Sequence, residues 1–339
     1  MTSYDRCVQN CMDYFASVQN ADGSFHMAEQ DLVAYYKPVL AMTIAGRYRR
    51  AALALDWIEK SFLRRDGDFV TADGCKSRVP HFGKHFYYYI HGWLMQSFVL
   101  NGRFDLLGKA VAHVLPRQHE SGGFYSQRMG EGESPPATLD AGSTCSCGFG
   151  LLYAGRSAEA SRAGDFLIEL LDDQQDERIF YLRRETGGPL ITDFDPESSD
   201  AMFFRLRPGD SFEMWALGYA CAFLSKLWGL TGKKVYLEAA GRYLERAEVY
   251  KPQAYNTIPS VKIGWGAAVY HAATGDKRAE DIARRVLDYL VETQLAAGYW
   301  YFSDLYLRPA DQPFEIGADL SGEMVLRVCD IQRELAGTG

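Results

Sequence analysis

Apolar residues recur at three- and four-residue spacing in six segments of the chain, with charged residues at the positions between them. This periodicity predicts amphipathic α-helices that bury one side and expose the other. The six segments are residues 4–19, 48–63, 104–118, 157–173, 235–250 and 277–294. From this pattern we expect six outward-facing helices.

A second set of six helical runs is apolar on nearly every side and rich in glycine. Each run stops at a glycine, which can take the left-handed backbone conformation that ends a helix. The first five runs lead directly into a charged helix, so apolar and charged helices alternate along the chain. The terminal glycines are Gly46, Gly102, Gly155, Gly232, Gly275 and Gly337.

Six charged and six apolar helices in alternation predict two concentric rings. The charged helices form the outside, and the apolar helices face a central cavity. This is an all-α (α/α)6 toroid, which we expect to form one domain over residues 1–339. Two short strand-like runs, residues 178–184 and 298–304, fall in the connections between helices and do not compete with this fold.

The connections between helices are unequal in length, and this locates the expected site. A tight glycine turn joins each apolar helix to the next charged one. Long segments lead back to the apolar helices, among them residues 66–83, 120–142 and 176–210. Because long loops on one face of a rigid scaffold commonly build a site, we expect the first turns of the inner helices to line it.

Charge and composition exclude several classes of function. The net charge is −8 and no basic run is present, which argues against nucleic acid and anionic membranes as partners. No apolar stretch is long enough to cross a bilayer, and acidic residues interrupt the N-terminal apolar run, unlike in a signal peptide. The seven cysteines lack disulfide-like spacing. We therefore expect a cytoplasmic protein with a small-molecule substrate, and leave homo-oligomerisation open.

One segment carries a resemblance to a known group of toroids. Residues 14–25, YFASVQNADGSF, resemble the Gln-x-x-x-Gly-x-aromatic repeat of the terpenoid cyclase and protein prenyltransferase superfamily, with weaker copies ending at Phe69, Phe124 and Trp300. The resemblance implies a toroid, but not one chemistry. Related toroids include linalool dehydratase-isomerase, lanthipeptide cyclases, sugar 2-epimerases and unsaturated glucuronyl hydrolases.

The motifs that define the chemistry of that superfamily are absent. The chain has no Asp-x-Asp-Asp acid motif, and Asp140 and Cys145 are too far apart for the Asp-x-Cys element of a prenyltransferase zinc site. Cys145 and Cys147 would point in different directions on a helix. The P-loop, dinucleotide and Gly-x-Ser-x-Gly motifs are also missing. We therefore expect no metal and no cofactor.

The segment HFGKHFYYYIHGW, residues 81–93, precedes and opens the second inner helix. His85 and His91 flank Tyr88 there, and histidine suits proton transfer near neutral pH. The alternative is structural, with His85 capping the helix and His91 hydrogen-bonded in the core.

The third inner helix opens at Asp140, an expected catalytic acid at the edge of the cavity. Its alternative is an N-cap, because aspartate accepts backbone N–H groups at a helix start. Cys145 in the same helix is either a nucleophile or proton donor, or a small buried thiol that allows close packing with Gly148 and Gly150.

Further candidates lie where the other inner helices begin. Glu213 is either catalytic or the partner of Asp210 in a capping box. Arg205 either binds an anionic group of a substrate or pairs with the acidic loop around Asp195. Lys262 lies beside Trp265, and Asp319 lies one helical turn before Glu323. The remaining expected substrate-binding residues are Asp31, Tyr35, Tyr36, Lys37, Tyr88, Trp215, Trp265 and Glu323.

These residues predict an enzyme that uses acid and base groups in an aromatic-lined cavity. A cyclase, isomerase or lyase on a terpenoid-like or other small oxygenated substrate would use Asp140 as proton donor. Aromatic faces would stabilise developing positive charge. A sugar hydrolase or epimerase would use the same aromatic rings as stacking surfaces. A non-catalytic toroid that binds a peptide or small ligand is the third alternative.

Overall fold

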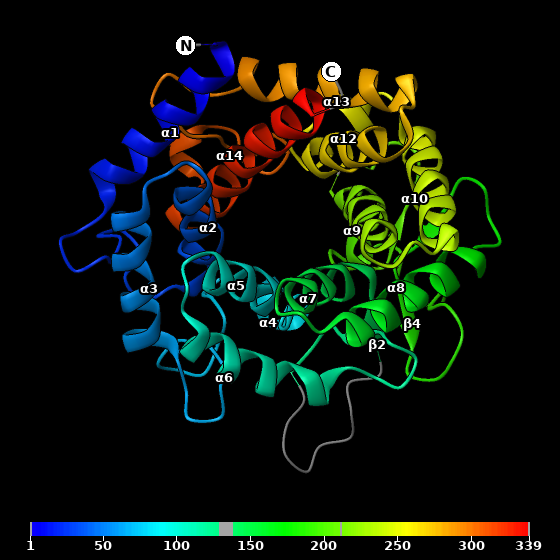
Figure 1. Ribbon diagram of the computed structural model, residues 1–339, viewed down its shortest axis with the longest axis horizontal. Coiled ribbons are helices and arrows are strands. Elements are labelled where there is room, and N and C mark those ends of the chain that lie inside the picture. The colour runs from blue at the N-terminus through cyan, green and yellow to red at the C-terminus, as the bar shows by residue number, and fades with distance from the viewer. Residues whose placement is uncertain (1, 129–137, 211, 338–339) are drawn as a thin grey trace.

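The computed structural model describes residues 2–128, 138–210 and 212–337. Its helices form two concentric rings around a central axis, as Figure 1 shows. The outer ring consists of α1 (Ser3–Val18), α3 (Tyr48–Phe62), α6 (Phe104–Val114), α8 (Ser157–Asp172), α10 (Lys234–Ala247) and α13 (Lys277–Glu292). The inner ring consists of α2 (Tyr36–Ile44), α5 (Tyr89–Leu100), α7 (Ala141–Tyr153), α9 (Trp215–Thr231), α12 (Val261–Thr274) and α14 (Phe314–Ala336). The predicted (α/α)6 toroid is confirmed.

The two rings differ in burial, as the sequence pattern predicts. The outer helix α13 buries one stripe of apolar residues at three- and four-residue spacing and exposes the charged positions between them. The inner helix α5 is buried at every position from Tyr89 to Phe98, because it packs against the outer ring and against both neighbouring inner helices. The main core of the molecule therefore lies between the rings.

Two glycines let neighbouring inner helices pack closely. A Cβ atom at Gly92 of α5 would lie 2.0 Å from the backbone oxygen of Ser146 on α7. A Cβ atom at Gly218 of α9 would lie 2.2 Å from the backbone carbon of Lys262 on α12. Only glycine fits at such distances, so these positions set the spacing of the ring.

The glycine turns behave as predicted in five of six cases. Five of the terminal glycines have φ between 68° and 74°, the left-handed conformation that ends a helix. Gly337 differs, because its φ is −75° and α14 ends without a left-handed residue. The prediction of one shared helix end was therefore wrong for the last run.

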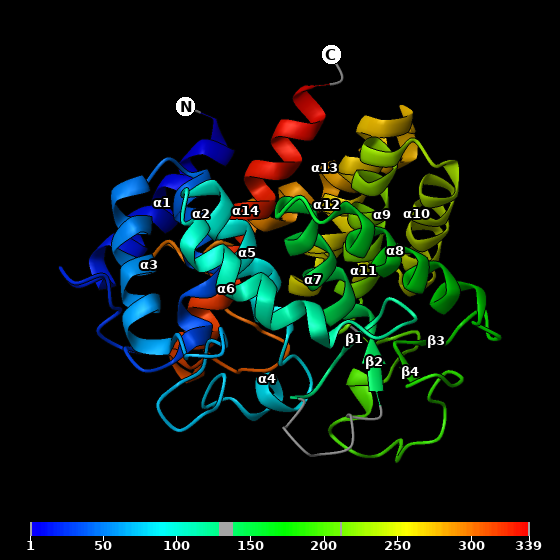
Figure 2. The ribbon, with the colours of Figure 1, turned by 60° about the horizontal axis from the view of Figure 1, so that its bottom comes forward.

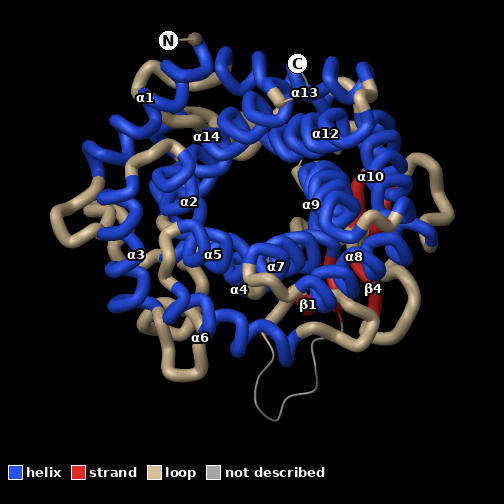
Figure 3. The backbone as a smooth tube through the Cα atoms, viewed as in Figure 1, coloured by secondary structure: helices blue, strands red, loops and turns tan. Residues whose placement is uncertain are grey.

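The long connections gather on one face of the toroid, where Figure 2 shows them together with the strands and the short helix α4 (Pro80–Lys84). A second short helix, α11 (Gln253–Asn256), precedes α12. The strands are confined to one sector of the ring (Figure 3). They are β1 (Phe124–Tyr125), β2 (Thr138–Asp140), β3 (Phe180–Tyr181), β4 (Arg183–Glu185) and β5 (Arg205–Leu206).

The strands form two small antiparallel sheets, β1-β2-β4 and β3-β5. In the first sheet Leu139 pairs with Arg184, so the connection after α8 is bound to the segment that leads into α7. The expected strand-like run at 298–304 contains no strand. Among the described helices, none has the length and apolar character needed to cross a membrane.

Candidate functional site

A cavity of about 100 Å³ lies inside the inner ring, on the side of the long connections. The first turns of α2, α5, α9, α12 and α14 contribute to its wall, together with α4 and the connection before α14. The wall is mostly aromatic or apolar and contains a few buried charged groups. The charged or titratable residues that line it are Lys37, His81, Glu213, Lys262, Asp319 and Glu323.

A buried ion-pair network crosses the wall between α2, α12 and α14. Lys37 Nζ lies 2.9 Å from Asp319 Oδ2 and 2.8 Å from Glu323 Oε2. Lys262 Nζ lies 2.8 Å from Glu323 Oε1. Asp319 and Glu323 stand one turn apart on α14, so both reach Lys37, and Glu323 also reaches Lys262.

Burial and pairing shift these groups in different directions. Burial alone would lower the pKa of Lys37, but Asp319 and Glu323 outweigh it and raise the pKa above the ordinary value. Burial opposes ionisation of Glu323, yet Lys262 and Lys37 hold its pKa well below the usual range. Burial raises the pKa of Asp319 despite the neighbouring Lys37. Glu323 is therefore the firmly ionised carboxylate of the network.

Lys262 has an altered proton affinity in this wall. Burial lowers the pKa of Lys262 to about 8, although Glu323 opposes the shift. Its ammonium nitrogen lies 4.4 Å from the centre of the Trp215 ring and 5.4 Å from that of Tyr219. Lysine at this pKa exists partly as the free amine at neutral pH, which makes it a usable base.

Glu213 lies in the turn before α9, and the structure corrects the capping-box prediction. Helix α9 begins at Trp215 after Met214, which makes no side-chain cap, and Asp210 instead accepts the N–H of Arg207. Burial raises the pKa of Glu213 to about 8, although Arg183 opposes the shift. Its Oε1 atom has no hydrogen-bond partner among the described residues. Glu213 is therefore a protonated acid at neutral pH, with one oxygen unpaired.

Asp140 is the N-cap of α7, which was one of its two predicted roles. Its Oδ1 accepts the N–H of Ser143 at 2.7 Å, and burial raises its pKa although Arg183 opposes the shift. Asp140 is not part of the cavity wall, but it raises the pKa of Glu213 electrostatically. Its role as catalytic acid stays a prediction.

The guanidinium of Arg183 is a buried cation that acts electrostatically on both Asp140 and Glu213. It donates to the Phe203 carbonyl at 2.8 Å and to Ser126 Oγ at 3.2 Å, and lies 3.0 Å from His85 Nδ1. His85 is the C-cap residue of α4, and its ring stacks on that of Phe203 with ring centres 4.2 Å apart. His85 therefore supports the loops beside the cavity and does not line it.

His91 lies apart from His85, so the two histidines do not form one proton-transfer site. His91 faces the outer ring, where its ring stacks on His113 with centres 5.1 Å apart. Tyr88 neighbours His91 with ring centres 6.0 Å apart, as the helical spacing predicts, and is also absent from the cavity wall.

Several other expected residues have structural contacts away from the cavity. Asp31 accepts the N–H groups of Val33 and Arg78 and joins two connections. The Tyr35 hydroxyl accepts the N–H of Phe25. Arg205 lies over the Phe194 ring at 5.4 Å, and among the described residues it makes no ion pair with the acidic loop around Asp195. None of these three lines the cavity.

Cys145 is fully buried, and burial raises the pKa of its thiol well above the ordinary value. A protonated thiol is a poor nucleophile, so the packing alternative agrees better with its surroundings. The close packing predicted around it is present, because a Cβ at Gly148 would lie 2.4 Å from the Phe223 ring.

Trp265 and Arg327 pack against each other outside the lining of the first cavity. The Arg327 guanidinium lies 3.5 Å from the centre of the Trp265 ring, and its Nε lies 3.5 Å from Glu323 Oε1. Both residues line a second cavity of about 200 Å³. Trp265, an expected substrate-binding residue, therefore lines the second cavity and not the first.

The structure brings Tyr36, Lys37, Glu213, Trp215 and Glu323 of the expected site residues into the cavity wall. Other wall residues were not singled out, notably Tyr89, Phe86 and His81. Their signal was present, because they belong to the aromatic segment 81–93. Arg183 was not singled out either, because it comes from a connection that the sequence pattern does not place.

The fold and this cavity define the chain as an (α/α)6 toroid. No protein-family model matches it, and no curated protein sequence matches it. Solved structures do match. A D-mannose isomerase superposes with a TM-score of 0.70 at 8% identity, covering 97% of both chains.

Two further solved structures show how widely this fold is used. A GH76 α-mannanase from Bacteroides thetaiotaomicron has a TM-score of 0.65 at 11% identity, covering 98% of this chain and 97% of that chain. A type II terpene cyclase from Scytonema has a TM-score of 0.54 at 12% identity, covering 97% of this chain and 98% of that chain. Terpenoid cyclases are therefore only one of several similar toroids, and these likenesses establish the fold alone.

Proposed function

We propose that the protein is an enzyme that isomerises or epimerises a small oxygenated substrate by moving a proton next to a carbonyl group. One observation carries the proposal. Glu213 and Lys262 line the same buried cavity. Burial raises the pKa of Glu213 to about 8 and lowers the pKa of Lys262 to about 8. A neutral acid and a partly neutral base are thereby available together near neutral pH.

Each group has a defined part in the proposed reaction. The Lys262 amine removes a proton from the carbon beside the carbonyl, and the electron pair moves onto the carbonyl oxygen. Glu213 donates its proton to that oxygen, which gives a neutral enol. For isomerisation, the Lys262 ammonium gives its proton to the former carbonyl carbon, while the Glu213 carboxylate takes the proton of the hydroxyl on the neighbouring carbon, whose oxygen becomes the new carbonyl. For epimerisation, water gives a proton to the opposite face of the original carbon, the Glu213 carboxylate takes back the enol proton, and the Lys262 ammonium returns its proton to the hydroxide that is left. The Lys37 ammonium stabilises negative charge on oxygen during these steps.

The charges in the wall favour negative charge that develops on the carbonyl oxygen over a carbocation. The ammonium of Lys37 lies within 5.7 Å of the ring centres of Tyr36, Tyr89 and Trp93. Lys262 lies over Trp215. The aromatic faces that a cyclase would use are therefore already in contact with cations. A carbocation formed here would be repelled by the two ammonium groups, whereas an enolate would be stabilised.

A sugar or similar polyhydroxylated carbonyl compound suits this wall best. Aromatic rings can stack on the C–H faces of such a molecule, and Asp319, Glu323 and Lys37 can bond its hydroxyl groups. The likeness to a D-mannose isomerase supports this substrate class only through the shared fold. A glycoside hydrolase on the same scaffold would need a water-activating carboxylate. The firmly ionised candidate, Glu323, is already held by two lysines.

A product assay on the purified protein tests the proposal. Aldoses, ketoses and their uronic acids would be offered beside prenyl diphosphates and oligosaccharides, and the products identified by NMR. We expect interconversion of sugar isomers or epimers, with activity lost in Lys262→Met and kept in Lys226→Met. Lys226 is a suitable control because it also pairs with a glutamate, Glu334, at 2.7 Å, but lies outside the cavity. Turnover of only a prenyl substrate or a glycosidic bond would refute the proposal.

A further inference from the structure

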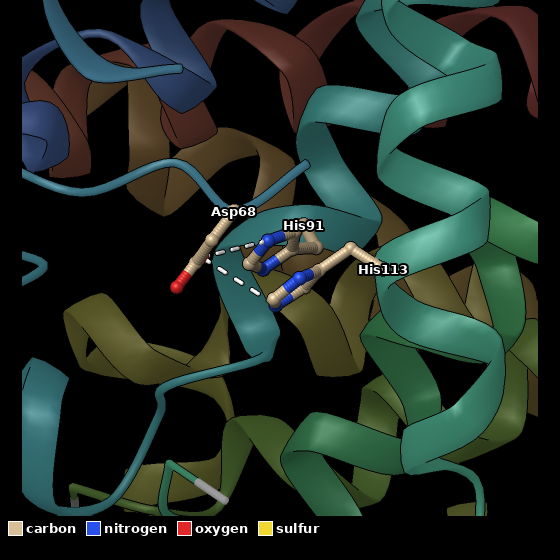
Figure 4. Close-up of side chains that lie close together, drawn as sticks. All are labelled: Asp68, His91 and His113. Atoms are coloured by element: carbon tan, nitrogen blue, oxygen red, sulfur yellow. Dashed lines mark ion pairs between the residues drawn. The ribbon is translucent and has the colours of Figure 1, made fainter. Parts of the chain in front are cut away.

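A second cluster of chemically versatile residues lies between the two helix rings, away from the central cavity. Asp68 belongs to the connection after α3, His91 to the inner helix α5, and His113 to the outer helix α6. Figure 4 shows the three side chains converging. Their potential ligand atoms all lie within 4.8 Å of one another, and all three residues are buried.

The spacing of these atoms matches the edges of a small coordination polyhedron. His91 Nε2 lies 3.2 Å from Asp68 Oδ1, and His113 Nε2 lies 3.7 Å from the same oxygen. Tetrahedral zinc has bonds of roughly 2.0–2.2 Å to nitrogen and oxygen, which places its ligands about 3.3–3.6 Å apart. The two measured distances bracket that range.

The imidazole nitrogens of the cluster lack other partners. Apart from the Asp68 carboxylate, both ring nitrogens of His91 and Nε2 of His113 have no hydrogen-bond partner among the described residues, although they are buried. Such groups are normally paired, so each unpaired nitrogen requires an explanation.

The hydrogen bond made by His113 Nδ1 determines whether Nε2 of the same ring has a lone pair available for a metal. His113 Nδ1 lies 3.2 Å from the carbonyl oxygen of Asp66, which can only accept, so Nδ1 carries the proton. In the neutral ring, Nε2 then directs a lone pair towards the Asp68 carboxylate. A metal-bound histidine is commonly oriented by this kind of bond to a backbone carbonyl.

We propose that Asp68, His91 and His113 bind a divalent transition metal, with zinc as the best match to two imidazoles and one carboxylate. The three protein ligands leave a fourth position for a water molecule, and because the buried site would join α5, α6 and the connection after α3, its expected role is structural. It is independent of the proposed isomerase function and departs from the sequence-based expectation of no metal.

Lys76 is the cation that contacts the Asp68 carboxylate in this structure. Its ammonium group contacts Asp68 Oδ1 and also donates to the Phe69 carbonyl oxygen at 2.7 Å. Metal binding requires Lys76 to leave Oδ1, and the Phe69 carbonyl offers it a remaining partner. The Tyr87 hydroxyl bonds the other carboxylate oxygen at 2.5 Å, so Oδ1 is the oxygen available to a metal. Removing the Lys76 charge should therefore strengthen metal binding.

The test uses the full chain, stripped with a chelator and then titrated with Zn²⁺ or Co²⁺. We expect one metal ion bound per chain, a cobalt spectrum typical of tetrahedral nitrogen and oxygen ligands, and a melting temperature raised by roughly 5 °C or more. His113→Ala should weaken binding by more than about 100-fold. The matched control is His271→Ala, because His271 is equally buried and its Nδ1 also bonds a backbone carbonyl, that of Asp276, at 2.8 Å.

A second variant decides the matter if His113→Ala does not fold. Lys76→Met keeps all three ligands and should bind Zn²⁺ at least about tenfold more tightly than the unchanged protein. It should also show the larger rise in melting temperature on addition of metal. The proposal is overturned if neither the unchanged protein nor Lys76→Met binds metal stoichiometrically, or if a folded His113→Ala binds as tightly as the His271→Ala control.

Discussion

Lys262 on α12 and Glu323 on α14 form a buried ion pair, with the lysine nitrogen 2.8 Å from a carboxylate oxygen. The same carboxylate also pairs with Lys37 of α2 at 2.8 Å. One firmly ionised carboxylate thus faces two lysines, while burial shifts the other carboxyl groups of the wall, Asp319 and Glu213, towards their neutral forms. The cavity is therefore suited to negative charge on a substrate.

Glu213→Gln should remove activity without damaging the fold. Glutamine has the shape of the protonated acid but cannot donate the proton, so kcat should fall by about 10²–10⁴. Because burial raises the pKa of Glu213 to about 8, the folded state holds this proton more tightly than the unfolded state. Wild-type stability should therefore fall as pH rises from about 4.5 through 8, and the variant should lack that fall. Urea unfolding across this pH range measures it, and a parallel loss in both proteins would contradict the account.

The pH dependence of kcat/KM should be bell-shaped with its maximum near pH 8. Below this pH Lys262 is protonated and cannot act as a base, and above it Glu213 is ionised and cannot act as an acid. The rate should approach a fall of about tenfold per pH unit on both sides. A rate that keeps rising to pH 10 would show that no acid of this kind is needed.

Lys37→Met should destabilise the protein, because it removes an ionic partner of both Asp319 and Glu323 in a buried site. Removing one member of a buried pair typically costs about 3–5 kcal/mol. The double change Lys37→Met with Asp319→Leu should recover part of that loss, because the Asp319 carboxyl is then gone and Glu323 keeps Lys262 as its partner. Denaturant unfolding gives the values, and additive losses would mean that the two groups are not coupled.

Two substitutions at Asp140 separate its role as the N-cap of α7 from its expected role as catalytic acid. Asp140→Ala should lower the free energy of unfolding by about 1 kcal/mol, whereas Asp140→Asn should retain the cap to the Ser143 N–H. We expect Asp140→Asn to keep activity within about tenfold of wild type. A well-folded Asp140→Asn as inactive as Glu213→Gln would restore Asp140 as the catalytic acid.

The fold was largely predictable from the sequence, because each helix carries its own local signal. The one-sided charge of α13 and the all-round apolar character of α5 reveal the two rings, and Gly46 and its counterparts mark where helices end. The strands β1–β5 were less predictable, since each has only two or three residues and depends on pairing with distant segments.

The site was only partly predictable, because ring closure brings distant residues together. Lys37 and Asp319 are 282 positions apart and meet only because the first and last inner helices become neighbours. From the sequence, Glu213 could be explained as a capping residue. The structure places it before the start of α9, where its side chain does not cap the helix and Oε1 has no hydrogen-bond partner among the described residues. His91 was expected in the cavity, but it faces the outer ring, a direction that the segment alone does not fix.

Solvent exchange tests the central claim most directly. The protein would be incubated with an accepted sugar in D₂O, and deuterium at the carbon beside the carbonyl followed by NMR. The account predicts enzyme-dependent incorporation that falls at least about 100-fold in Glu213→Gln and in Lys262→Met, while Lys226→Met behaves as wild type. Turnover without any deuterium in the product, or incorporation unchanged in both variants, would contradict it.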